Sequence, residues 1–119
     1  MSIAKNLETL HGALQPKDVT LVAVSKTKSS PEIQEAYDAG QRIFGENNAH
    51  ELVEKYESVP KDIEWHLIGH LQTNKVKYIA SFVHCIQSVD SLKLLKEINK
   101  HAQKHGRVIN CLLQVFIAE

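Results

Sequence analysis

The stretch LVAVSKTKSSPEIQEAYDAG, residues 21–40, reads as a strand followed by a helix. Its first residues belong to a continuous apolar, β-branched run over residues 19–25, which is typical of a strand covered on both faces. The serines that follow offer an N-cap, and Pro31 suits the first turn of a helix. Gly40 is a signal that ends a helix. This stretch therefore predicts one strand–helix unit.

The same unit recurs along the rest of the chain. A helix is predicted over residues 2–14, and further strands are predicted over residues 42–46, 63–69, 82–89 and 108–117, with helical patterns between them. Repeats of strand, helix and strand imply right-handed crossovers and a parallel sheet. Two α/β architectures fit this order, an open doubly wound sheet and part of a (β/α)8 TIM barrel.

As a barrel, the chain would be incomplete. A full (β/α)8 barrel takes about 250 residues, whereas this chain has 119. The pattern supplies about four βα units and a fifth parallel strand, and the sequence stops on that apolar strand. In this interpretation, residues 1–119 form a single truncated barrel domain.

The composition is that of an ordinary soluble globular protein, with 43% hydrophobic and 24% charged residues. Basic and acidic residues number 14 each, and this balance argues against a partner such as nucleic acid or an anionic membrane. No signal peptide and no apolar run of the roughly 20 residues that span a membrane are evident. Cys85 and Cys111 lie in apolar stretches and are expected to be buried thiols. We therefore expect a cytoplasmic protein.

Polar and ionisable residues recur where the predicted strands end. In both parallel architectures, ligands bind at the carboxyl ends of the strands. These ends carry Lys26, Glu46, Asn47, residues 66–70 and Ser88. No Gly-rich nucleotide-binding loop is present, so a Rossmann or P-loop interpretation lacks its phosphate cradle. The sequence predicts a ligand site at this edge of the sheet.

Lys26 is the residue in this set with the most distinctive chemistry. Side chains alternate along a strand, so Lys26 shares one face with Val22 and Val24. Inside a barrel, that face is apolar and partly dry, and desolvation favours the neutral amine, which can attack an aldehyde to form a Schiff base. The alternative is a lysine that ends its strand in water. Lys28 is either an electrostatic neighbour of this amine or a loop residue.

Three segments together resemble the pyridoxal phosphate homeostasis protein family, also called the proline synthetase co-transcribed family. They are LVAVSKTK (21–28), AGQRIFGEN (39–47) and WHLIGHLQTNK (65–75). The resemblance covers essentially the whole chain and implies a barrel of the alanine racemase N-terminal type, without the second, β-rich domain of that enzyme. Members of the family bind pyridoxal 5′-phosphate (PLP) as an internal aldimine and are regarded as cofactor carriers, with no established turnover.

The resemblance also implies roles for individual residues. It makes Lys26 the aldimine lysine and places Asn47 and His66 in the cofactor pocket, with no catalytic residue and no metal ligand. The later strands of family members carry the phosphate-binding turns and an arginine that faces the pyridine nitrogen. The 119 residues contain no counterpart of those strands.

The sequence leaves three possible functions open. The first is a non-catalytic PLP-binding protein, here the N-terminal half of its barrel. The second is a PLP enzyme of the racemase or decarboxylase type, which needs a second proton-transfer group opposite the lysine and a closing domain. The third is a half-barrel fragment unable to bind cofactor. An open half-barrel exposes sheet edges near residues 21–25 and 108–117, so a homo-oligomer is predicted.

Other residues with possible chemistry receive structural interpretations. His101 and His105 have the i, i+4 spacing of helical metal ligands, but a third ligand is not evident, and we expect a solvated face. Trp65 and Phe82 are expected to pack in the core. His84 receives no role.

Overall fold

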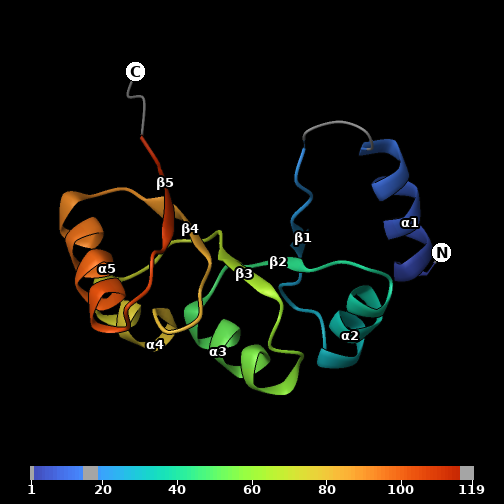
Figure 1. The fold of residues 1–119 in the computed structure, drawn as a ribbon, viewed down its shortest axis with the longest axis horizontal. Coiled ribbons are helices and arrows are strands. Elements are labelled where there is room, and N and C mark those ends of the chain that lie inside the picture. Colours follow the sequence, from blue (N-terminus) through green and yellow to red (C-terminus); the bar gives the residue numbers. More distant parts are fainter. Residues whose placement is uncertain (1, 15–18, 116–119) are drawn as a thin grey trace.

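Strands and helices alternate along the chain in the order that the sequence pattern predicts. The structure, a computed structural model, describes residues 2–14 and 19–115 (Figure 1). The elements are α1 (Ile3–Leu14), β1 (Ala23–Val24), α2 (Ser30–Asp38), β2 (Ile43–Glu46), α3 (Ala49–Ser58), β3 (Glu64–Leu67), a 3-10 turn (Thr73–Lys75), α4 (Val76–Ile79), β4 (Cys85–Val89), α5 (Leu92–Lys104) and β5 (Asn110–Leu113).

The five strands form one sheet in which spatial order equals chain order, β1-β2-β3-β4-β5. All four neighbouring pairs are parallel. A doubly wound sheet reverses its strand order at a switch point, and this sheet does not, so the partial-barrel prediction is confirmed. Figure 1 shows the helices in an arc along one side of the sheet.

The core fills the layer between the sheet and the helices. Phe44 of β2 lies beside Trp65 of β3 in the strand register, with their ring centroids 5.8 Å apart. Trp65, Leu67 and Ile86 are completely buried. The prediction that Trp65 packs in the core is confirmed, and Phe82 stacks at its edge on the Tyr56 ring, with 3.8 Å between centroids.

The opposite face of the sheet is open, which corrects the prediction for the first strand. Residues 19–25 were expected to form a strand covered on both faces, but only Ala23–Val24 pair as β1, and Val24 is 51% exposed. β1 lies at the sheet edge, and among the described residues no layer covers its second face. β5 is likewise shorter than predicted, and the predicted positions 116–117 lie outside the described residues.

Helix ends follow their capping signals. Ser29 and Glu32 form a capping box, in which the Ser29 hydroxyl accepts a hydrogen bond from the Glu32 N–H at 3.3 Å and Glu32 accepts one from the Ser29 N–H at 3.0 Å. Asn48 caps α3 and Ser91 caps α5 through side-chain oxygens that accept backbone N–H groups of the first turn. The helix predicted after β3 is only a 3-10 turn and one turn of α4. Neither piece has a side-chain N-cap, which fits their short length.

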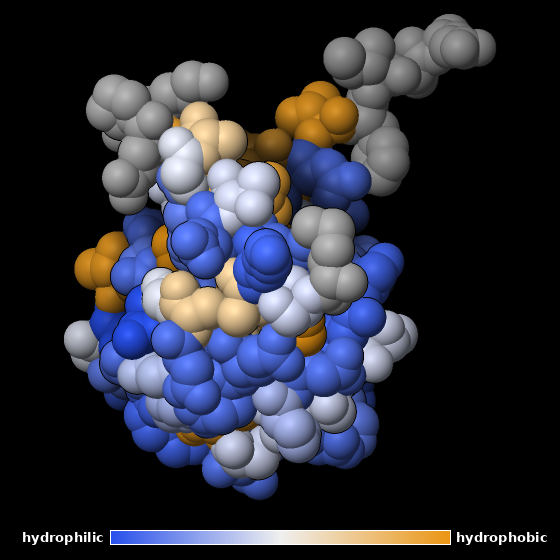
Figure 2. All heavy atoms as spheres, turned by 90° about the vertical axis from the view of Figure 1, so that its right-hand side faces the viewer, coloured by the Kyte–Doolittle hydropathy of each residue, from blue (hydrophilic) through white to orange (hydrophobic). Residues whose placement is uncertain are grey.

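The surface on the helical side is mainly hydrophilic. Figure 2, which views the molecule from the side of α1 and α2, shows hydrophobic side chains there only in separate spots. Within residues 2–14 and 19–115, none of the helices has the length and apolar composition needed to cross a bilayer. Cys85 is buried and Cys111 half-buried, both are free thiols, and burial raises the pKa of each.

Candidate functional site

The carboxyl ends of β2, β3 and β4 are in direct contact, as the parallel topology predicts. A Cβ atom on Gly69 would lie 2.3 Å from the Asn47 carbonyl oxygen, so the loop after β3 approaches the loop after β2 through a position without a side chain. The Ser88 hydroxyl donates a hydrogen bond to the Gly69 carbonyl oxygen at 2.5 Å. Three of the predicted strand-end positions therefore form one continuous surface.

A buried polar network lies beneath the end of β1. Lys55 of α3 is 7% exposed, and its ammonium group donates to Glu46 Oε2 at 2.8 Å and to the Ser25 carbonyl oxygen at 2.6 Å. The Ser25 hydroxyl donates to the same Glu46 oxygen. Glu46 is completely buried. Glu46 was predicted among the strand-end site residues, but it faces α3 instead of the open face.

This network continues into the turn that carries Lys26. Glu51 Oε1 accepts hydrogen bonds from Lys55 Nζ at 2.8 Å and from the Thr27 N–H at 3.0 Å. The Lys55 hydrogen bond, followed by that of Thr27, lowers the pKa of Glu51. Thr27 has a φ of 63°, in the left-handed region that non-glycine residues rarely adopt. The residues on both sides of Lys26 are thus fixed by α3.

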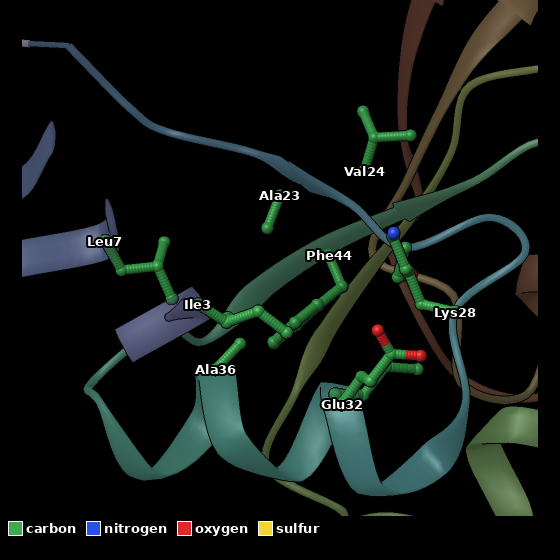
Figure 3. A pocket seen from close by; sticks show the side chains of 10 residues that line it. Ile3, Leu7, Ala23, Val24, Lys28, Glu32, Ala36 and Phe44 are labelled. Carbon is green, nitrogen blue, oxygen red and sulfur yellow. The ribbon is translucent and has the colours of Figure 1, made fainter. Parts of the chain in front are cut away.

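Lys26 itself is exposed. The expectation of a dry, enclosed amine is therefore wrong for this structure, and the reason is the open face described above. Ser25 points into the layer between the sheet and α3. Because side chains alternate along a strand, the next side chain, that of Lys26, is expected on the opposite, open side. Lys28 lines an apolar pocket between β1, α1 and α2 together with Glu32 (Figure 3). In this position Lys28 is a loop residue of the helical side.

His66 lies in β3 and is half-buried. It is in register with Gly45 of β2, which in turn pairs with Val24 of β1. Its Nδ1 atom is 2.9 Å from the Gln87 amide nitrogen. Burial, followed by the nearby His84 charge, lowers the pKa of His66, while Glu64 opposes this shift. The net effect favours the neutral form of the imidazole.

Asn47 directly follows β2 and is half-buried. The register Gly45 to His66, extended by two residues, places Asn47 beside Ile68, and the Ile68 N–H donates to the Glu46 carbonyl oxygen at 2.9 Å. Two residues of a strand rise about 7 Å. Asn47 therefore stands about 7 Å beyond the level of His66 along the strands, while Lys26 lies in the turn that follows β1.

Comparison with known proteins places this arrangement in a family. Residues 1–117 match the profile described as alanine racemase, N-terminal domain. The chain belongs to this family. In this alanine racemase-like domain, the partial barrel described above is the shared architecture.

The relatives of this chain include several pyridoxal phosphate homeostasis proteins. The chain is 44% identical to that of Aquifex aeolicus over 96 residues, which are 80% of this chain and 42% of the relative. It is 38% identical to that of Escherichia coli strain K12 over 108 residues, 87% of this chain and 46% of the relative. The domain thus spans about half the length of these relatives.

A solved structure of a relative agrees with the fold. The chain is similar to PipY of Synechococcus elongatus PCC7942, in a structure described as having PLP bound. The TM-score is 0.88 and the identity 39%, over 98% of this chain and 56% of that chain. The structure of PipY without PLP gives a TM-score of 0.91 over 99% of this chain.

Sequence reasoning about this alanine racemase-like domain missed two groups of residues. The i, i+4 spacing of Glu51 and Lys55 on α3 could have indicated an ion pair between them. The pairing of Lys55 with Glu46, however, depends on the fold. Glu64 shares one face of β3 with His66, and His84 lies beside His66 only because β3 and β4 are neighbours. The solvated-face prediction for the last helix is wrong for His101, whose side chain is 12% exposed and bonded to Glu97. It agrees with the exposure of His105.

Proposed function

We propose that this domain binds PLP as part of a PLP homeostasis protein and holds the cofactor as a Schiff base on Lys26, without turnover. The observation that carries the proposal is the position of Lys26 in a turn anchored at both neighbours by a buried network. The name of the curated relatives and the PLP-bound structure of PipY support the choice of ligand.

The open face of the sheet offers the chemistry that this role needs. Lys26 supplies the amine, which must lose a proton before it attacks the aldehyde carbon and releases water. Asn47, which directly follows β2, has an amide that can donate to or accept from a polar ring substituent. His66 presents an imidazole on the open face of β3, where its ring can lie against the cofactor.

Replacement of Lys26 by alanine is expected to abolish covalent PLP attachment. The parent chain is incubated with PLP and reduced with borohydride, and the adduct is located by peptide mass spectrometry. We expect modification at Lys26 in the parent, at least a tenfold lower yield in Lys26→Ala, and an unchanged yield in Lys28→Ala. An equal yield in Lys26→Ala and the parent would contradict the proposal.

We further propose that a second copy of the chain covers the open face. Val24 and Leu112 are 51% and 54% exposed, and β1 and β5 are sheet edges with one partner each, a combination that favours association. A second copy of the chain is the occupant proposed, because it offers the same exposed apolar side chains and the same sheet edges to the first.

Light scattering coupled to size exclusion is expected to give the mass of two chains at micromolar concentration. Leu112→Lys places a charge on the open face and is expected to weaken the dimer about tenfold or more. Leu92→Lys is the matched control, because Leu92 is 65% exposed but lies at the start of α5. A parent chain that stays monomeric would rule out this assembly.

A further inference from the structure

Glu64, His66 and His84 bring a carboxylate and two imidazoles together on the open face of the sheet. Each residue offers one ligand atom, and the three atoms lie within 4.8 Å of one another. The His84 Nε2 atom is 3.7 Å from Glu64 Oε2, and the two imidazole centroids are 5.6 Å apart. Glu64 and His66 are alternate residues of β3 and share a face, while His84 directly precedes β4.

We propose that these three side chains bind one divalent transition-metal ion of the zinc class. Two imidazole nitrogens and one carboxylate oxygen form a ligand set that suits Zn²⁺ and Co²⁺ and leaves a fourth position open to water. Metal–ligand bonds of about 2.0–2.2 Å put tetrahedral ligand atoms about 3.3 Å apart. The side chains of Glu64 and His84 are 47% and 43% exposed, so they can rotate by the small amount required.

The ion pair between Glu64 and His84 does not explain the unsatisfied ring nitrogen of His66. Its Nε2 atom is buried and, among the described residues, has no hydrogen-bond partner. Its Nδ1 atom lies 2.9 Å from the Gln87 amide, which can turn its oxygen toward an Nδ1–H. That hydrogen bond leaves the Nε2 lone pair free for a metal, as outer hydrogen bonds do for most metal-bound histidines.

Asn110 lies beside the second imidazole. Its amide nitrogen is 3.4 Å from His84 Nε2, a long contact that a metal ion would replace. The Asn110 side chain could then contact a water in the open position of the ion. The proposed site therefore has three ligands and two amide neighbours, Gln87 and Asn110.

The proposed metal site is separate from the amine at Lys26. None of the three proposed ligands is Lys26, which lies in the turn after β1, and β2 separates β1 from β3 in the sheet. Metal binding therefore does not depend on PLP, and the two proposals can fail independently. His66 is the one residue shared by both.

Titration of the tag-free, metal-free chain with Co²⁺, without PLP, tests the inference. We expect a saturable d–d absorption at one ion per chain, which Zn²⁺ displaces. His84→Ala is expected to weaken binding more than 100-fold and Gln87→Ala about 10–100-fold. Lys26→Ala is expected to bind like the parent.

The matched control is His50→Ala, which removes a histidine that is also paired with a glutamate, Glu54, but on the exposed surface of α3. Circular dichroism without metal checks that each variant is folded. Absence of saturable binding would overturn the inference. Equal weakening by His50→Ala and His84→Ala would overturn it as well, since binding would then lie at surface histidines.

Discussion

Replacement of Lys55 by methionine is expected to lower the free energy of unfolding by about 3–5 kcal/mol at pH 7. Methionine retains most of the apolar length of the side chain, but the completely buried Glu46 carboxylate loses its counter-charge. Ser25 and Glu51 also lose their hydrogen bonds to the ammonium group. Removal of one partner of a buried ion pair is costly because the remaining charge stays desolvated.

Urea unfolding of four variants, Lys55→Met, Glu46→Gln, their double variant and the control Lys100→Met, measures this effect and its origin. The control Lys100→Met changes an exposed lysine of α5 and is expected to stay within about 0.5 kcal/mol of the parent. The double variant Glu46→Gln/Lys55→Met removes both charges, so its loss is expected to be smaller than the sum of the single losses. If Lys55→Met unfolds like Lys100→Met, the buried pair does not stabilise the fold.

Replacement of Gly69 by alanine is expected to cost about 3 kcal/mol, at the upper end of overpacking effects. The new Cβ would lie 2.3 Å from the Asn47 carbonyl oxygen and 2.8 Å from its Cα. Both are backbone atoms, so relief requires that the loops after β2 and β3 move apart. That movement would disturb the Ile68 N–H to Glu46 carbonyl hydrogen bond of 2.9 Å and the contact of Ser88 with Gly69.

Gly12→Ala is the matched control for this substitution. Gly12 lies in α1, and nothing is within 4 Å of the position its Cβ would take. Alanine there is expected to stabilise the chain by about 0.5–1 kcal/mol, because glycine is a poor helix former. Thermal unfolding of both variants is therefore expected to show shifts of opposite sign. Equal shifts would mean that the close approach at Gly69 is relieved without cost.

The order of elements could be predicted from the sequence, whereas the extent of the outer strands could not. The spacing of apolar residues and the capping residues are local signals, so α2 begins after one of the predicted serine caps, and α5 lies between the predicted strands as expected. β1 is shorter because strand length depends on a partner and on a covering layer, neither of which is visible in residues 19–25. The exposure of Lys26 has the same cause.

For the candidate site, the sequence could predict only which residues lie at the carboxyl ends of the strands. The parallel topology correctly brings Asn47, Gly69 and Ser88 together. The pairing of Glu46 with Lys55 and the approach of His84 to His66 depend on which faces meet across elements. A glutamate at a strand end can face either layer, and here Glu46 faces the helix.

Identical spatial and chain order of the strands also affects synthesis on the ribosome. Each strand pairs with the one translated just before it, so a partner already exists when a new strand leaves the exit tunnel. Few distant segments must find one another, and loop-closure entropy stays small at every step. The sheet can therefore grow strand by strand from the N-terminal side while translation continues.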